Sequence, residues 1–124
     1  MEVYVVIAGC RTYYNYEEAK DYIVSSLSEY KATDQITILS GGCKGADSLG
    51  ERFARENGFP IKRFLPDWEK YGKAAGPLRN KQMVDVCHKV ICFWDGKSKG
   101  TKSLIQYARK SAKDVAVKII CQKE

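Results

Sequence analysis

The chain has 124 residues, of which 44% are apolar, and it carries a formal net charge of +6. A chain of this size and composition can bury one core, so we expect a single domain over residues 1–124. No apolar run approaches the ~18 residues of a membrane span, and the N-terminus lacks the pattern of a signal peptide. These features predict a cytoplasmic protein with no membrane partner.

The five cysteines are odd in number, widely spaced and without a Cys-x-x-Cys pair. This pattern argues against a disulfide scaffold and against a zinc site, so we expect reduced thiols and no metal ligands. Cys92 and Cys121 fall within strand patterns and should pack as small apolar groups, whereas Cys10 and Cys43 fall in candidate site loops. His88 has no matching ligands and is interpreted as a structural or surface residue.

The first third of the chain predicts a strand, a helix and a second strand. Residues 3–8 form a nearly continuous β-branched run, which is typical of a central strand in a parallel sheet. Asn15 and Glu18 form a capping box, and apolar residues at helical spacing then predict a helix from about Tyr16 to Tyr30. The apolar run 36–40 predicts the second strand.

A glycine-rich turn follows this strand and leads into a second predicted helix. That helix should end before Gly58 and Pro60, which stop helices. Residues 61–64 predict a short third strand. The segment 65–75 is expected to be an unstructured loop, and loops of about ten residues in small domains are often functional.

The last third repeats the alternation of helix and strand. Gly76-Pro77 predicts a helix with proline at its first position, and residues 89–94 predict the fourth strand. A glycine-containing turn over 95–100 precedes a helix that Thr101 can cap and that runs to about Ala112. Residues 115–120 predict the fifth strand.

Alternating strands and helices of this kind specify an α/β fold with three layers and a mainly parallel five-stranded sheet. We expect a Rossmann-like domain with strand order 3-2-1-4-5. Ligands of such sheets bind beyond the carboxyl ends of the strands, near the reversal in strand order, so the loops after strands one, two and four should converge there.

The glycine-rich turn at residues 40–47 is the first candidate binding motif. It lacks the spacing and the closing Lys-Ser/Thr of a P-loop, and it follows the second strand, whereas a dinucleotide fingerprint follows the first. Its backbone amides and Lys44 can bind phosphate, and Asp47 can cap the helix or accept a hydrogen bond from a ribose or base. The alternative is that the glycines merely make a tight turn.

Two further clusters follow later strands. Arg79 offers a planar fork for bidentate phosphate binding, unless it is only a surface arginine at a helix start. The turn from Asp95 to Thr101 repeats the strand–turn–helix arrangement, so two helix N-termini should face one cleft. Trp68 and Tyr71 can stack on a purine, or can simply pack their loop against the body of the domain.

These motifs carry a family resemblance over nearly the whole chain. They read Ala8-Gly9-x-Arg11-Thr12, Ser40-Gly41-Gly42-x-Lys44-Gly45-Ala46-Asp47, Asp67-Trp68-x-x-Tyr71-Gly72-Lys73-Ala74-Ala75-Gly76-Pro77-x-Arg79-Asn80 and Phe93-Trp94-Asp95-Gly96-x-Ser98-x-Gly100-Thr101. The chain resembles YspA-type members of the SLOG superfamily, a Rossmann-like group that includes the LOG phosphoribohydrolases and DNA-processing protein A. The resemblance implies binding of nucleotides or nucleotide-derived ligands.

The resemblance to the LOG hydrolases extends to Arg79 and Met83 but omits one catalytic group. Those enzymes place a catalytic Glu just after the Gly-Thr of the fourth-strand loop, where this chain has Lys102, Ser103 and Leu104. Without that carboxylate no evident group stabilises the positive charge that builds on ribose during bond cleavage. Arg79, Asp47 and Asp95 are the remaining catalytic candidates.

The leading hypothesis is a binder or sensor of a phosphate-bearing nucleotide or of an ADP-ribose- or NAD-related ligand. Alternatives are a hydrolase or transferase acting on such ligands and, less favoured, a nucleic-acid-binding protein. No cofactor is identified, although Mg²⁺ could accompany a phosphate, and a homodimer is expected by analogy with related folds. The predicted ligand-binding residues are Gly9, Arg11, Ser40, Gly41, Gly42, Lys44, Gly45, Asp47, Trp68, Tyr71, Gly76, Arg79, Asn80, Asp95, Gly96, Gly100 and Thr101.

Overall fold

A computed structural model describes residues 1–120 of the chain. Cys121, which was expected to pack within a strand, lies outside these residues. The sheet contains β1 (Glu2–Gly9), β2 (Gln35–Ser40), β3 (Ile61–Arg63), β4 (Lys89–Trp94) and β5 (Asp114–Ile119). All neighbouring strands are parallel and their order is β3-β2-β1-β4-β5, which confirms the predicted topology.

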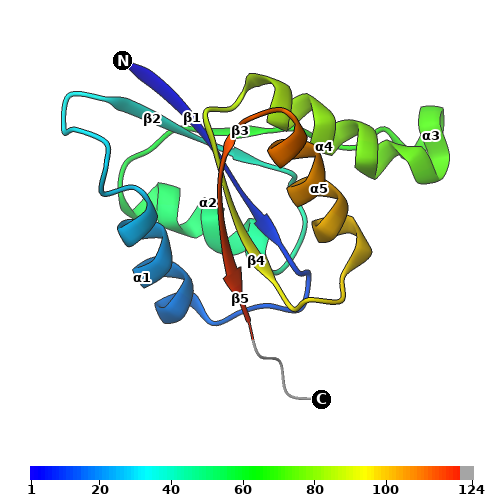
Figure 1. Ribbon diagram of the computed structural model, residues 1–124, viewed down its shortest axis with the longest axis horizontal. Helices are drawn as coiled ribbons and strands as arrows, with labels where there is room; N and C mark the ends of the chain where they lie inside the picture. Colours follow the sequence, from blue (N-terminus) through cyan, green and yellow to red (C-terminus); the bar gives the residue numbers. More distant parts are fainter. Residues whose placement is uncertain (121–124) are drawn as a thin grey trace.

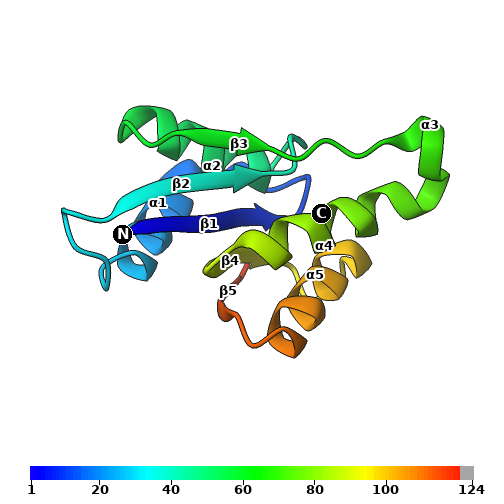
Figure 2. The same ribbon diagram turned by 90° about the horizontal axis from the view of Figure 1, so that it is seen from above.

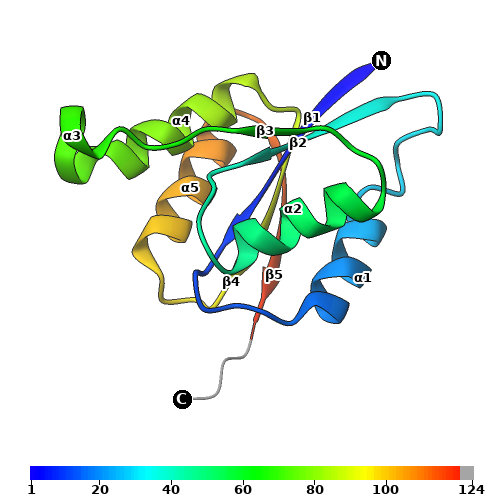
Figure 3. The same cartoon turned by 180° about the vertical axis from the view of Figure 1, so that it is seen from behind.

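Helices cover both faces of the sheet (Figure 1). One face carries α1 (Tyr16–Ser26) and α2 (Ala46–Glu56), and the other carries α4 (Ala75–Val86) and α5 (Lys99–Lys110). Figure 3, seen from behind, shows the same three layers. The predicted three-layer Rossmann-like α/β fold is therefore confirmed.

The core lies in two parts, one on each side of the sheet. Val3, Val5 and Ile7 point to the α1 and α2 side, while Val6 and Ala8 point to the α4 and α5 side. All five are at most 5% exposed, which explains the continuous apolar run of this central strand. Within residues 1–120 no helix is long and apolar enough to cross a bilayer.

The first helix is shorter than the sequence predicts, because it ends at Ser26 instead of near Tyr30. The amide of Leu27 donates to the carbonyls of both Ile23 and Val24, at 2.9 and 3.3 Å, so the last turn tightens and the chain leaves the helix. The side chain of Leu27 is nevertheless buried, which is why the helical pattern continues beyond the end of the helix.

The connection between β3 and α4 is not the unstructured loop that was expected. It contains the short helix α3 (Trp68–Tyr71) and a 3₁₀ turn, η1 (Gly72–Ala74). Asp67 begins α3 by accepting a hydrogen bond from the Lys70 amide at 3.1 Å. Figures 1 and 2 both show α3 at the end of an arm that projects from the body of the domain. The helix α4 then begins at Ala75, so proline is not its first residue.

Candidate functional site

Two adjoining pockets lie beyond the carboxyl ends of β1 and β2. The deep pocket has a volume of about 210 Å³ and is lined from β1, α2, α3, α4 and α5. The outer pocket has a volume of about 420 Å³ and lies against the glycine-rich turn and the start of the arm. Arg11, Cys43 and Trp68 line both pockets, so the two form one continuous site. The predicted convergence of loops at this edge of the sheet is correct.

The outer pocket combines cationic residues with glycine backbone. The residues that line it include Arg11, Lys44, Gly41 and Gly42, and no carboxylate from residues 1–120 lines it. Gly42 has a positive φ of +73°, a conformation that glycine adopts without strain. Positive charge beside glycine backbone is an arrangement that suits an anionic ligand.

The other glycines at this site are needed for close packing of the protein itself. A Cβ on Gly9 would lie 2.2 Å from the Phe93 carbonyl oxygen, and one on Gly45 would lie 2.4 Å from the backbone of Arg11. Neither Gly9 nor Gly45 lines a pocket. The tight-turn interpretation of the motif at residues 40–47 therefore fits Gly45, whereas Gly9, which lies outside that motif, allows close packing at the end of β1.

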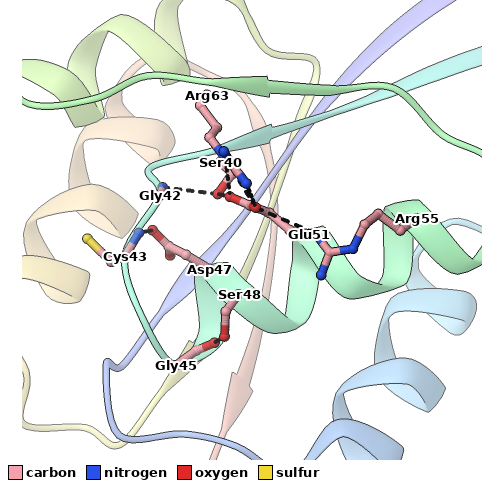
Figure 4. Close-up of polar contacts among 9 residues, drawn as sticks. All are labelled: Ser40, Gly42, Cys43, Gly45, Asp47, Ser48, Glu51, Arg55 and Arg63. Atoms are coloured by element: carbon pink, nitrogen blue, oxygen red, sulfur yellow. Dashed lines mark hydrogen bonds and ion pairs between the residues drawn. The ribbon is translucent and has the colours of Figure 1, made fainter.

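A buried network holds the glycine-rich turn from behind (Figure 4). The hydroxyl of Ser40 accepts a hydrogen bond from the Gly42 amide at 3.1 Å and donates one to Glu51 Oε2 at 2.6 Å. Arg63, on β3, donates to both oxygens of Glu51, and this contact lowers the pKa of the Glu51 carboxyl. Ser40 is fully buried and lines neither pocket, so it positions the turn.

Asp47 folds back onto the turn and does not cap α2. Its Oδ2 accepts a hydrogen bond from the Cys43 amide at 3.2 Å, whereas the N-cap residue, Gly45, provides no side-chain cap. Asp47 is only 5% exposed but lines the deep pocket. Burial raises the pKa of its carboxyl to about 6, even though the Cys43 amide and the nearby Arg79 favour the charged form.

Arg79 is a buried part of the site and not a surface arginine. Its Nη1 donates to the Gly41 carbonyl at 2.6 Å and its Nε donates to Asn80 Oδ1 at 2.8 Å. A Cβ on Gly41 would lie 2.5 Å from the same Nη1, so a larger residue there would displace the guanidinium from this position. The guanidinium lines the deep pocket, but Nε, Nη1 and Nη2 already contact Asn80, Gly41 and Cys43. The side chain therefore does not present the pair of free N–H groups that a bidentate contact with phosphate needs.

The second turn, between β4 and α5, is held by its own acidic side chain. Asp95 Oδ1 accepts hydrogen bonds from the amides of Lys97 and Ser98, each at 2.8 Å, and these bonds lower the pKa of its carboxyl. Ser98 is the N-cap of α5, and its hydroxyl accepts from the Thr101 amide, so the prediction of Thr101 as cap is wrong. Thr101 instead lines the deep pocket.

The two aromatic residues of the arm differ in position. Trp68 lines both pockets, and a Cβ on Gly76 would lie 3.6 Å from its ring, so the indole lies over the start of α4. Tyr71 is 44% exposed and lines neither pocket. Trp68 is thus the aromatic side chain that is placed to stack on a ligand.

The pockets contain most but not all of the predicted ligand-binding residues. Those that line a pocket are Arg11, Gly41, Gly42, Lys44, Asp47, Trp68, Gly76, Arg79, Asn80, Gly100 and Thr101. Those that do not are Gly9, Ser40, Gly45, Tyr71, Asp95 and Gly96. The pockets are also lined by nine residues that were not among the predicted ligand-binding residues: Ala8, Cys43, Leu65, Pro66, Pro77, Met83, Ser98, Ser103 and Leu104.

The remaining polar candidates have structural roles in the described part of the chain. His88 Nδ1 accepts a hydrogen bond from the Tyr4 amide at 3.0 Å and its ring stacks on Tyr4, which confirms a structural role. Cys10, Cys43, Cys87 and Cys92 are free thiols, and Cys92 is fully buried in the core as predicted. Among residues 1–120 no group of three or more His, Cys, Asp or Glu residues is placed to hold a metal ion.

Comparisons with known proteins agree with this architecture. The sequence model of the YspA, cpYpsA-related SLOG family matches residues 3–71. The Gene 61 protein of Mycobacterium phage D29 is 34% identical over 116 residues, which cover 86% of this chain and 89% of that protein.

Two solved structures share the fold at low sequence identity. DNA processing protein A (DprA) from Streptococcus pneumoniae superposes with a TM-score of 0.72 and 18% identity over 94% of this chain. This chain spans only half of DprA, since the match covers 50% of that protein. The protein TM1055 superposes with a TM-score of 0.64 and 21% identity, over 93% of this chain and 72% of that one.

Proposed function

We propose that this chain, which belongs to the YspA, cpYpsA-related SLOG family, binds a phosphate-bearing nucleotide or nucleotide-derived small molecule as a sensor or binder. Membership of the family indicates nucleotide-related binding or processing in general terms. The observation that carries the finer proposal is the outer pocket, where two cationic side chains and glycine backbone meet without a carboxylate.

The phosphate belongs in the outer pocket. Arg11 and Lys44 supply positive charge there, and both are exposed enough to reach a bound anion. Hydrogen bonds between charged partners contribute about 1.5–3 kcal/mol each, so two such contacts supply about 3–6 kcal/mol, and micromolar binding, at about 8 kcal/mol, also needs contacts in the deep pocket. A Mg²⁺ ion, if one is needed, would be bound through the phosphate itself.

The sugar and base belong in the deep pocket. Its apolar lining, which includes Ala8, Met83 and Leu104, suits a planar ring, and Asn80 and Thr101 offer hydrogen bonds. Trp68 borders both pockets and is placed to cover the ligand where they meet. Stacking on an aromatic ring contributes about 1–3 kcal/mol in nucleic-acid sites.

A ligand titration tests this proposal. AMP, ADP-ribose, NAD and cyclic dinucleotides would be titrated by calorimetry and by thermal shift, with adenosine as the matched ligand without phosphate. Arg11→Ala should weaken binding about tenfold or more, because it removes a charged contact. Lys110→Ala, which removes an equal charge from the far end of α5, should leave affinity unchanged. Equal affinity for AMP and adenosine, or no response to the whole panel, contradicts the proposal.

A second candidate function is hydrolysis of an N-glycosidic bond, and the position of Asp47 favours it over other chemistry. Asp47 lines the deep pocket and has a pKa of about 6, whereas Asp95 lines neither pocket. A carboxyl with that pKa can donate its proton to the departing base as the bond from ribose C1′ to the base breaks, and water that adds to C1′ returns a proton to the carboxylate. The products would be ribose 5-phosphate and a free base.

Product analysis distinguishes hydrolysis from simple binding. Incubation of AMP with the protein should release adenine, detectable by chromatography, and Asp47→Asn should abolish release while AMP still binds. Asp95→Asn should retain turnover because Asp95 lies outside the pockets. Unchanged turnover in the Asp47→Asn variant rules out this role, and bound but uncleaved AMP supports the binder alone.

A further inference from the structure

The two edges of the sheet are not equally protected against pairing with another strand. The edge strand β3 has three residues, two of which are Lys62 and Arg63. The other edge strand, β5, has six residues and reads Asp-Val-Ala-Val-Lys-Ile. Within residues 1–120 it pairs only with β4, and Figure 2 shows β3 and β5 on opposite sides of the sheet. Short, charged strands resist edge pairing, and longer apolar ones invite it.

The backbone of β5 presents hydrogen-bonding groups away from the sheet. The Ile120 amide donates to the Trp94 carbonyl of β4 at 2.8 Å. Because successive peptide groups of a strand point to opposite sides, the amides of Ala116 and Lys118 also face β4. The amides and carbonyls of Val115 and Val117 therefore face outward.

We propose that β5 pairs in antiparallel orientation with β5 of a second copy of this chain, with Ala116 opposite Ala116 of the partner subunit. A two-fold axis perpendicular to the sheet places equivalent side chains of the two copies on the same face of the joined sheet. It therefore pairs odd residues with odd and even with even. The outward-facing Val115 and Val117 of the two copies then exchange their hydrogen bonds across the axis.

Charge complementarity selects this register. With Ala116 at the centre, Asp114 of each copy lies opposite Lys118 of the other, so opposite charges meet twice. The Asp114 side chain is 54% exposed, and one of its oxygens, Oδ2, accepts from Lys89 at 3.0 Å, which leaves Oδ1 for a second partner. On the opposite face Val115 meets Val117 of the other copy, an apolar pair that favours sheets.

The dimer would join two five-stranded sheets into one continuous sheet. The two β5 strands run in opposite directions, so the strands of the two halves have their carboxyl ends on opposite sides of the joined sheet. The two candidate sites, which lie beyond those ends, are therefore far apart. Neither site would contribute residues to the other. The inference is therefore independent of the proposed ligand, and dimer-breaking variants should keep their affinity for AMP.

A cysteine at the centre of the interface tests the proposal most sharply. Residues opposite each other at a position without hydrogen bonds have Cα atoms about 4.5 Å apart, within the range that a disulfide spans. Ala116→Cys should form a covalent dimer under mild oxidation, well above the level in the parent chain. Val24→Cys, an exposed position on α1, serves as the matched control and should not.

Two non-covalent variants complete the test. The parent chain should have twice its 14.0 kDa mass in light scattering at micromolar concentration. Val117→Pro removes an outward amide and should yield a folded monomer, since proline is tolerated on the open side of edge strands. Lys118→Glu should raise the dimer dissociation constant about tenfold or more, and Lys110→Glu should not change it. A monomeric parent chain, or a dimer that resists both Val117→Pro and Lys118→Glu, overturns the proposal.

Discussion

The two turns that precede α2 and α5 look alike in the sequence but serve different purposes. Each follows a strand, contains glycine and opens a helix, and each binds its own aspartate. Asp47 occupies the Cys43 amide of the first turn, and Asp95 occupies the Lys97 and Ser98 amides of the second. Both turns border the deep pocket, but within residues 1–120 only the first of the two also borders the outer pocket, which Arg11 and Lys44 line.

The comparison shows that a helix N-terminus is not sufficient to make an anion site. The protein uses some of these amides for its own carboxylates, as helix caps commonly do. What distinguishes the first turn is the pair of nearby cations, Arg11 and Lys44, and the brace formed by Ser40 and Glu51 behind it. Near the second turn, Lys97 and Lys99 line neither pocket.

The largest expected effect comes from breaking the brace behind the first turn. Glu51→Ala leaves the buried Ser40 hydroxyl without its charged acceptor and removes the partner of the exposed Arg63, so it should destabilise the fold by about 3 kcal/mol. Urea denaturation measures this loss. Glu17→Ala, at an exposed position on α1, should cost about 1 kcal/mol or less. Equal losses for the two variants would mean that the network does not hold the turn.

The next effect is a gain of stability that depends on pH. The pKa of Asp47 is raised to about 6, so between about pH 4 and 6 the folded protein retains a proton that the unfolded chain releases. Stability therefore falls as the pH rises through this window. Asp47→Asn removes this penalty and should stabilise the protein by about 2 to 3 kcal/mol at pH 8.

The pH dependence itself identifies the cause. Below about pH 4 the Asp47 carboxyl is protonated in both the folded and the unfolded chain, so the stability gained by Asp47→Asn should vanish there. Asp21→Asn, at an exposed position on α1, should change stability by less than about 0.5 kcal/mol at either pH. A gain for Asp47→Asn that stays constant with pH would contradict the assignment of a buried, charged Asp47.

The smallest expected effect concerns the second turn. Asp95→Ala removes the acceptor for two amides and should cost about 1 kcal/mol in thermal or chemical unfolding. Because Asp95 lines neither pocket, AMP affinity should change less than about threefold. A loss of affinity as large as that of Arg11→Ala would indicate that the phosphate binds at this second turn and not in the outer pocket.

The fold was predictable because its signals are local. The apolar run 3–8 identified a strand buried on both faces, and the alternation of strand and helix patterns specified the parallel order. The predictions failed where short-range hydrogen bonds decide the outcome, as at the early end of α1 after Ser26 and in the helix α3 that Asp67 caps.

The site was predictable as a set of loops but not in the roles of its side chains. Residues such as Arg11, Lys44 and Trp68 line the pockets as their motifs indicated. The engagement of Arg79 with the Gly41 carbonyl joins residues 38 positions apart, and no local pattern reports such a contact. Sequence patterns therefore identify which loops meet but not which hydrogen bonds they already make.

The most direct test of the account is to observe which turn responds to a phosphate. Amide chemical shifts of the ¹⁵N-labelled protein would be followed during titration with AMP and, separately, with adenosine. The account predicts that AMP shifts the amides of Gly41, Gly42 and Lys44 most, and that adenosine leaves them nearly unchanged. Shifts confined to residues 96–101, or identical responses to the two ligands, would contradict the assignment of the outer pocket as the phosphate site.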